Sequence, residues 1–255
     1  TPVAVLSSHF RPVSHYFRQN FSQVTNPPID SLRENKVMSL KTRFGNLGNI
    51  LNFDNLTEEN IYVLDSPILT NSQFKKFKKF FSKKLKVIDC TFDIGKSLKE
   101  RIESIREEAE TAVREGSTCL VLSDKDISNQ KASIPSILTV GAVHSHLVKH
   151  GLRGYCSLNV ECSDAMDTHS FAILIGVGAT TVNPYLAIDS IYQRFEKKLF
   201  GKSDFETCVI KFKKSIDAGL LKIMSKMGIS VISSYRGGCN FEAVGLSRAI
   251  VSDYF

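Results

Sequence analysis

The chain has 255 residues, of which 42% are hydrophobic, and its formal net charge is +7. This length fits one large domain or two small ones, and the apolar fraction is high enough for a substantial core, which excludes a disordered or collagen-like chain. The longest apolar stretch, residues 171–182, is too short and too rich in glycine to span a bilayer, so we expect no membrane segment.

The positive charge is densest at residues 74–86, FKKFKKFFSKKLK, where seven lysines are interleaved with four phenylalanines. On a helix, Phe74, Phe77 and Phe81 share one face and the lysines occupy the other, which predicts an amphipathic surface helix. Lysine outnumbers arginine by 22 to 11, whereas recognition of phosphates and bases favours the planar fork of arginine. We therefore expect no nucleic-acid partner.

Apolar runs separated by turn residues predict that strands and helices alternate along the chain. Residues 60–70 read as a buried strand that continues into a loop. The further predicted strands are at 85–93, 118–124, 155–162, 180–185 and 229–235. The predicted helices are at 74–86, 97–116, 136–148, 168–179, 186–195 and 203–227, and a last helix follows residue 240 and reaches the C-terminus.

Several of these helices carry their own boundary residues. Thr70 or Asn71 can cap the helix that holds the lysines and phenylalanines. Ser97 followed three residues later by Glu100 is a capping box, and Gly116 ends that helix. Gly228 is expected to end the longest helix in the same way.

Repeated βα units of this kind predict an α/β fold with a mainly parallel sheet wrapped by helices. In such folds, ligands and partners gather at the carboxyl ends of the strands. The loops expected there are 122–129, 160–167, 182–185 and 234–242. No break in composition marks a linker, so residues 1–255 are expected to form a single domain.

Three histidines near the end of a predicted helix suggest a metal site, but the pattern is incomplete. His146 and His150 are four residues apart and can share a helix face, whereas His144 cannot join them. No HExxH motif is present, and no nearby carboxylate in the sequence supplies a third ligand. We therefore expect surface histidines and no metal.

No catalytic residue is assigned from the motifs. The six cysteines form no CxxC pair and lie mostly in apolar runs, as free thiols of a reducing compartment do. Cys239 is the most plausible reactive thiol, although nothing in the sequence lowers its pKa. Its loop, residues 234–240, could cradle a phosphate with backbone N–H groups and Arg236. Gly176 and Gly178 lack the order of a dinucleotide site and are expected to permit close helix packing.

Five segments carry a resemblance to a known family. They read QVTNPPIDSLRENKVMSL at 23–40, LDSPILT at 64–70, and then the longer stretches 121–153, 169–187 and 219–247. In this order they resemble the central domain of the glutamate synthase large subunit, over nearly the whole chain. The resemblance implies a degenerate TIM-barrel-like α/β fold. It also implies an excised piece, from which the N-terminal glutaminase and the C-terminal FMN and iron–sulfur domains are absent.

The resemblance implies a function that joins two reactions. In that family the glutaminase releases ammonia, which passes through a protein tunnel to the flavin site, where reductive amination converts 2-oxoglutarate to glutamate. The chain would then be a connecting domain that helps form the tunnel. It would belong to an oxidoreductase that acts on CH–NH2 donors and would be inactive by itself. It would hold no cofactor, since FMN and the iron–sulfur cluster belong to the full-length subunit.

The same resemblance implies the partners and the location. The partners would be the glutaminase and FMN domains of the same polypeptide, and the electron donor would be a small NADPH-oxidising subunit or ferredoxin. The location would be cytoplasmic, or a plastid in a eukaryote. Two alternatives remain open: a free-standing FMN-linked barrel oxidoreductase, and a non-catalytic scaffold from a reduced homologue.

The segment 23–40 is stiff, because two consecutive prolines fix their own φ angles and restrict the residues before them. The resemblance implies that Thr25 and Asn26 lie at the tunnel mouth. Asp30 and Arg33, three residues apart, could brace the turn into the next helix and belong to the same tunnel and interdomain set.

Further site residues follow from the resemblance. Met38 and Ser39 would come near the flavin and 2-oxoglutarate of the full enzyme. The candidates for interdomain loops are Tyr235, Arg236 and Glu242. The chain departs from the family pattern mainly in the loops where neighbouring domains would dock, at Ser31, Lys125, Ser163, Asp164, Ser170 and residues 238–240.

Overall fold

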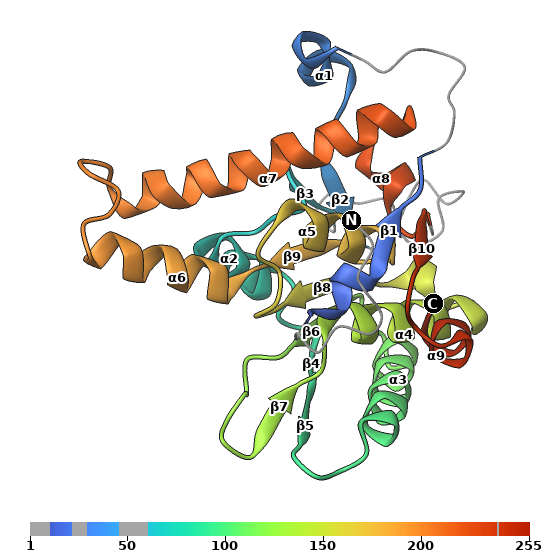
Figure 1. The fold of residues 1–255 in the computed structure, drawn as a ribbon. Helices are drawn as coiled ribbons and strands as arrows, with labels where there is room; N and C mark the ends of the chain where they lie inside the picture. Colours follow the sequence, from blue (N-terminus) through green and yellow to red (C-terminus); the bar gives the residue numbers. More distant parts are fainter. Residues whose placement is uncertain (1–10, 22–29, 46–60, 239) are drawn as a thin grey trace.

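The computed structural model describes residues 11–21, 30–45, 61–238 and 240–255 (Figure 1). Its helices are η1 (Val13–Tyr16), α1 (Ser31–Val37), α2 (Asn71–Phe80), α3 (Leu98–Arg114), α4 (Ser136–Lys149), η4 (Arg153–Tyr155), α5 (Thr168–Gly176), α6 (Tyr185–Glu196), α7 (Phe205–Met227), α8 (Ile232–Tyr235) and α9 (Arg248–Tyr254). Its strands are β1 (Phe17–Gln19), β2 (Thr42–Phe44), β3 (Tyr62–Leu64), β4 (Leu85–Asp89), β5 (Thr91–Asp93), β6 (Cys119–Ser123), β7 (Lys131–Ser133), β8 (Ser157–Glu161), β9 (Thr181–Asn183) and β10 (Phe241–Ala243).

A four-stranded sheet with the order β4–β6–β8–β9 lies at the centre of the fold. All of its strand pairs are parallel, and in the register Val121 lies between Val87 and Asn159. Successive strands of this sheet are joined through α3, α4 and α5, so neighbours in space are also neighbours along the chain. Beyond β9, Ile68 forms a parallel bridge to Val182. The predicted α/β fold of repeated βα units around a parallel sheet is confirmed.

The two faces of this sheet bury different cores. Along β6, Leu120 and Leu122 belong to the main hydrophobic core, whereas Cys119 and Val121 belong to a second cluster. This alternation follows from the two-residue period of a strand. The second cluster contains Phe44, Phe74, Phe77 and Phe81, so α2 covers that face with its aromatic side. The predicted amphipathic helix is therefore present, and Thr70 caps it in a capping box with Gln73.

Three antiparallel ribbons surround the sheet within the described part of the chain: β1 with β10, β2 with β3, and β5 with β7. The first brings residues near the two ends of the chain together, because Phe17 pairs with Ala243 and Gln19 with Phe241. The strands of these ribbons each have three residues, which is too short for a readable periodic pattern. The sequence therefore predicted none of the ribbons as such.

One of the predicted strands is wrong in kind. Residues 229–235 form the short helix α8 and only a single bridge, between Val231 and Ser39. Ile232 and Tyr235 are the buried residues of α8, and their three-residue spacing suits a helix face. The strand predicted within residues 60–70 is present as β3, but it is half-buried and pairs antiparallel with β2. The predicted C-terminal helix is α9, with β10 before it.

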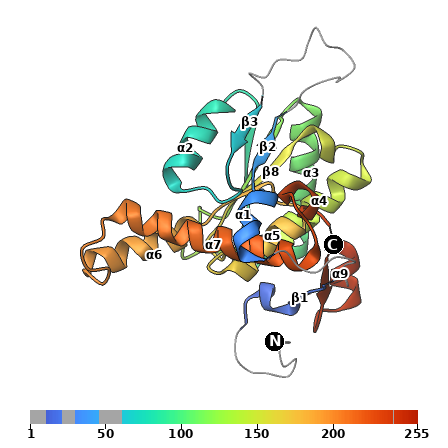
Figure 2. The same ribbon diagram turned by 90° about the horizontal axis from the view of Figure 1, so that it is seen from above.

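The long helix α7 has clear boundaries. The Asp204 side chain accepts the Thr207 N–H at its start, and Gly228 ends it with a left-handed φ of 69°. Helices α6 and α7 lie side by side and extend away from the sheet, as both Figure 1 and Figure 2 show. In the described residues, no helix combines the length and the apolar character needed to cross a membrane.

Candidate functional site

The carboxyl ends of the parallel strands carry a buried carboxylate, as barrel folds lead one to expect. Glu161 ends β8, and its Oε2 accepts a hydrogen bond of 2.8 Å from the Ser123 hydroxyl at the end of β6. Its Oε1 lies 3.5 Å from Lys78 Nζ and 3.7 Å from Lys125 Nζ. Two lysines thus compensate one carboxylate whose side chain is only 6% exposed.

The loops that follow the strands are tied to one another. Asp124 accepts hydrogen bonds from the Ser163 amide (3.0 Å) and hydroxyl (2.5 Å). Burial raises the pKa of Asp124, and the two bonds from Ser163 oppose that rise. Asp164 in turn accepts bonds from the amide and hydroxyl of Ser136 at the start of α4. These bonds tie the strand-end loops to one another and favour rigidity, while Asp124 Oδ1 is buried without a hydrogen-bond partner among the described residues.

The predicted tunnel residues lie partly outside the described residues, since Thr25 and Asn26 belong to segment 22–29. Asp30 caps α1, and its carboxylate accepts the N–H groups of Leu32 and Arg33, both at 3.0 Å. Arg33 Nε lies 3.4 Å from Asp30 Oδ2, and both side chains are exposed. The pair therefore makes the contact expected at this turn, while its role at a tunnel stays a prediction.

The segment after α1 is tied to the turn between α7 and α8. Ser39 N–H donates to the Ser230 carbonyl at 2.8 Å, and the Ile232 N–H donates to the Ser39 carbonyl at 3.0 Å. Met38 is buried beside this bridge with 7% exposure. Met38 and Ser39, which were expected near the flavin, are therefore held next to α8, the helix that ends at Tyr235.

The candidate interdomain residues differ in exposure. Tyr235 was expected on a loop, but it ends α8 with 1% exposure, and its hydroxyl donates to Gln19 Oε1 at 2.7 Å. Glu242 is exposed on β10, opposite Arg18 in the register. Of these two residues, Tyr235 holds β1 against α8, and Glu242 is exposed, while its role at an interdomain contact stays a prediction.

Arg236 lies next to a second arginine in the interior. Burial and, after it, the charge of Arg153 lower the pKa of Arg236 to about 10. Both residues line a cavity of about 230 Å³ at the amino-terminal ends of the strands. Arg153 donates to His144 Nδ1 and to the Gly178 carbonyl, so its guanidinium joins α4 to the loop after α5.

The glycines of the apolar helix α5 act through close packing, as expected. An added Cβ on Gly178 would lie 2.3 Å from His144 Nδ1, and one on Gly176 would lie 2.2 Å from Phe241 Cε2. The backbone of this segment therefore approaches both α4 and β10 more closely than any side chain would allow.

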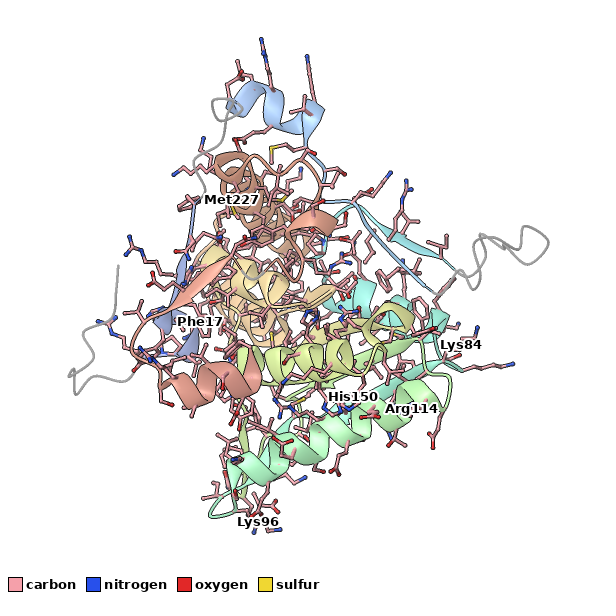
Figure 3. The ribbon with its side chains drawn as sticks, turned by 90° about the vertical axis from the view of Figure 1, so that its right-hand side faces the viewer. Phe17, Lys84, Lys96, Arg114, His150 and Met227 are labelled. Atoms are coloured by element: carbon pink, nitrogen blue, oxygen red, sulfur yellow. The ribbon has the colours of Figure 1, made fainter. Side chains whose placement is uncertain are left out.

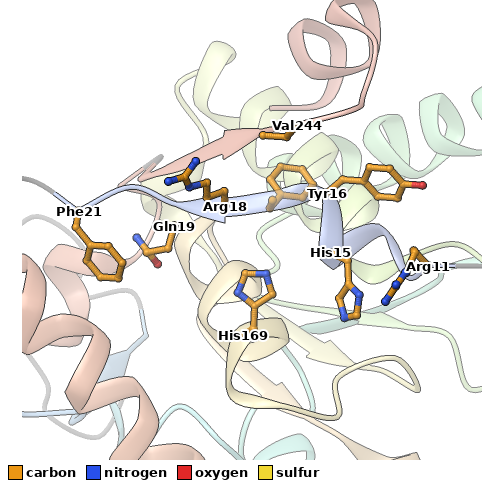
Figure 4. Close-up of a pocket in the computed structure, with 9 residues that line it drawn as sticks. Arg11, His15, Tyr16, Arg18, Gln19, Phe21, His169 and Val244 are labelled. Atoms are coloured by element: carbon orange, nitrogen blue, oxygen red, sulfur yellow. The ribbon is translucent and has the colours of Figure 1, made fainter. Parts of the chain in front are cut away.

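A groove of about 750 Å³ lies between η1, β1 and α5. Figure 4 shows His169 directed from α5 toward β1, with His15 and Arg11 beside each other. Arg18 is the second arginine of the groove, and among the described residues that line it none is acidic. Its chemistry therefore suits a carboxylate-bearing segment.

The histidine pair on α4 has a partner that the sequence did not reveal. His146 and His150 share a face as expected, but a carboxylate does complete the group, because Glu110 of α3 reaches both. The expectation that no third ligand is nearby is therefore wrong. Glu110 precedes His146 by 36 residues, and only the packing of α3 on α4 brings them together.

The thiols of the described residues are buried. Cys90, Cys119, Cys156, Cys162 and Cys208 are free. Burial raises the pKa of Cys90 and of Cys119 to about 12, so both stay protonated and unreactive. Cys239, the thiol singled out in the sequence, lies outside the described residues.

The family model and the curated relatives that match this chain agree on one family. Residues 1–247 match the model described as the glutamate synthase central domain. The glutamate synthase [NADPH] large chain of Azospirillum brasilense is 54% identical over 258 residues, and that of Bacillus subtilis is 41% identical; each alignment covers 100% of this chain and 17% of the relative. The ferredoxin-dependent glutamate synthase of Spinacia oleracea is 40% identical, with 100% of this chain and 16% of the relative covered.

The chain thus spans about a sixth of the length of these relatives. Among solved structures, a flavocytochrome b2 mutant with pyruvate bound matches with a TM-score of 0.44 and 15% identity, over 73% of this chain and 44% of that one. A likeness of this size carries no argument about function.

Proposed function

The chain belongs to the glutamate synthase central domain family, and from this premise we propose that it is the non-catalytic connecting domain of a longer glutamate synthase polypeptide. It links the glutaminase domain to the FMN-binding domain and helps form the ammonia tunnel between them. The activity it serves is the reductive amination of 2-oxoglutarate to glutamate. Residues 1–255 act in this role as one domain.

The proposal is supported by an alignment that covers all of this chain but only a small part of the relative's length. The whole chain aligns at 54% identity, yet it accounts for only 17% of the Azospirillum brasilense large chain. Most of such a polypeptide therefore lies outside this chain, and the catalytic groups are expected there. The NADPH and ferredoxin forms named among the relatives support a small NADPH-oxidising subunit or ferredoxin as the electron donor.

The strand ends support a structural role over a catalytic one. In a barrel enzyme this face holds the ligand, but here Glu161, Asp124 and Asp164 are bonded to the chain's own serines and lysines. FMN and the iron–sulfur cluster accordingly belong to the full-length subunit in this proposal. The location is cytoplasmic, or a plastid in a eukaryote, as the chloroplastic form in Spinacia oleracea exemplifies.

Flavin binding tests the non-catalytic part of the proposal. The purified chain is titrated with FMN, with and without 2-oxoglutarate, and followed by flavin absorbance and fluorescence. We expect no bound flavin and no saturable binding. Stoichiometric FMN would instead establish the free-standing barrel oxidoreductase. A longer polypeptide without intact glutaminase and iron–sulfur segments would establish the scaffold of a reduced homologue.

Coupling of the two reactions tests the connecting role. In the longer polypeptide, Asp30→Ala with Arg33→Ala removes the brace of the turn before α1. We expect less glutamate per glutamine hydrolysed, with free ammonia as the difference, while the glutaminase rate stays unchanged. Lys96→Ala is the matched control, because it also removes an exposed ion pair, at the start of α3. Equal ratios in both variants would contradict a tunnel role for the pair.

The basic groove is the expected contact for a neighbouring domain of the same polypeptide. Its two arginines and two histidines, with no acidic side chain among the described lining residues, suit an acidic segment of that domain. The charge reversal Arg18→Glu should therefore lower the same ratio or the yield of folded polypeptide. Lys96→Glu, which reverses an exposed charge away from the groove, should leave both unchanged.

A further inference from the structure

Three side chains of metal-ligating types, already noted on α3 and α4, lie close to one another. We call Glu110, His146 and His150 the Glu–His–His cluster. One ligand atom from each lies within 4.8 Å of the other two. Glu110 Oε2 is 2.6 Å from His146 Nε2 and 3.9 Å from His150 Nε2. Figure 3 shows the place, with His150 and Arg114 near each other on the two helices.

The packing of the two helices sets this arrangement. Arg106 Nε donates to the Ala142 carbonyl at 3.3 Å, one turn before the contact of Glu110 with His146. Ala109 of α3 is fully buried, as is Ala142 of α4, so small side chains allow the helices to approach. The two contacts lie one helical turn apart on both helices. The Glu–His–His cluster is therefore held by two packed helices and not by a loop.

The surroundings of the cluster orient its ligand atoms. His150 Nδ1 lies 2.8 Å from the His146 carbonyl, so Nδ1 carries the proton and Nε2 presents its lone pair to the cluster. Arg114 donates to Glu110 Oε1 at 2.8 Å, which leaves Oε2 for the histidines.

We propose that the Glu–His–His cluster binds a divalent transition-metal ion, with Zn²⁺ as the best fit. Two imidazoles and one carboxylate suit Zn²⁺, whereas Ca²⁺ and Mg²⁺ prefer oxygen ligands alone. Tetrahedral zinc places its ligand atoms about 3.3 Å apart, between the two distances seen here. Partly exposed side chains reach that spacing by small rotations, and the fourth position is open to water.

Binding has a defined chemical consequence. The proton of the hydrogen bond between His146 and Glu110 is displaced when the metal takes its place. The ion then joins α3 to α4 and binds only the folded chain, so it raises the free energy of unfolding. This inference does not depend on the proposed connecting role, because its readout is metal binding and not synthase activity.

The test is a ZnCl2 titration of the purified 255-residue chain by calorimetry, with CoCl2 absorbance as the probe of ligand type. We expect one ion per chain and a tetrahedral Co²⁺ spectrum without a thiolate charge-transfer band. His150→Ala and Glu110→Gln should each lower the affinity about tenfold or more. Circular dichroism checks the fold, and both residues are partly exposed, so the variants keep their cores.

The matched control is His15→Ala, which removes a histidine outside the cluster and should leave the affinity unchanged. The proposal is overturned if no saturable binding occurs. It is also overturned if His150→Ala binds as tightly as the parent chain, or if a thiolate band shows that cysteines hold the ion. An equal loss in His15→Ala would likewise place the ion elsewhere.

Discussion

We predict that alanine at Gly176 destabilises the chain, although alanine is the better helix residue. Gly176 is the buried last residue of α5. An added Cβ would lie 2.2 Å from Phe241 Cε2 and 3.1 and 3.2 Å from two further atoms of the ring. Nonbonded carbon atoms rest about 3.5–4.0 Å apart, so the ring of Phe241 has to move. Phe241 belongs to β10, which is held by β1 through its pairing with Gln19.

Two opposing effects decide the magnitude. Helix propensity favours alanine over glycine by about 1 kcal/mol in a helix interior. Overpacking of a filled core costs about 1–3 kcal/mol. Because the clashing ring is part of a paired strand, it cannot swing away freely, and we expect packing to win. The net loss should be about 1–2 kcal/mol in the free energy of unfolding.

Urea denaturation followed by circular dichroism measures this difference. Gly176→Ala should lower the urea midpoint with an unchanged slope. Gly154→Ala is the control, because a Cβ on this exposed residue meets no atom within 4 Å, and its midpoint should not fall. In a Phe241→Ala background the cost of alanine at Gly176 should vanish. A raised midpoint for Gly176→Ala would refute the reasoning.

Three further predictions concern buried polar groups. Tyr235→Phe removes the hydroxyl that donates to Gln19 and should cost about 1–2 kcal/mol of unfolding free energy, measured in urea. Asn159→Ala should cost at least about 2 kcal/mol by the same measurement, because Asn159 is fully buried and Thr181 loses its hydrogen-bond acceptor. Burial lowers the pKa of His144 to about 4 from 6.5, so the neutral form favours folding; stability should be full above pH 6.5 and fall toward pH 4. The pKa difference sets a limit of about 3 kcal/mol, which partial solvent access reduces to about 1–2 kcal/mol, and His144→Gln should flatten the profile.

Elements with their own boundary residues were predictable from the sequence. The Ser97 hydroxyl accepts the Glu100 N–H at the start of α3, and Gly228 ends α7, as the local patterns predicted. The reason is that caps and apolar stripes act within a few residues. The same holds for β6 and β8, whose apolar runs mark buried parallel strands.

Elements stabilised by distant partners were not predictable in this way. The ribbon of β1 and β10 joins residues more than 200 positions apart in the chain, as the contact between Gln19 and Tyr235 illustrates. Residues 229–235 carry an apolar pattern compatible with a strand. In the structure, however, this segment pairs with the Ser39 segment through a single bridge only, at Val231. The secondary structure of these segments therefore depends on which distant segment they pair with, and not on their own residue propensities.

The candidate sites also differ in whether they depend on local sequence or on residues distant in the chain. The resemblance to the family rests on residues that the sequence displays directly, and the comparisons confirm it over residues 1–247. The pairing of Asp30 with Arg33 could be anticipated because the two are three residues apart. By contrast, the carboxylate beside His146 and the counter-charges around Glu161 come from other helices and loops.

The sequence by itself determined the family, most of the alternation of strands and helices, and the buried faces of α2, α3 and α7, because these depend on short-range periodicity and on segments that resemble the family. Only the tertiary structure decided that Tyr235 is buried against Gln19, that Asp164 caps α4 through Ser136, and that Glu110 joins two histidines. Each of these contacts forms when packed elements bring side chains distant in sequence to within hydrogen-bond distance, which no local pattern encodes.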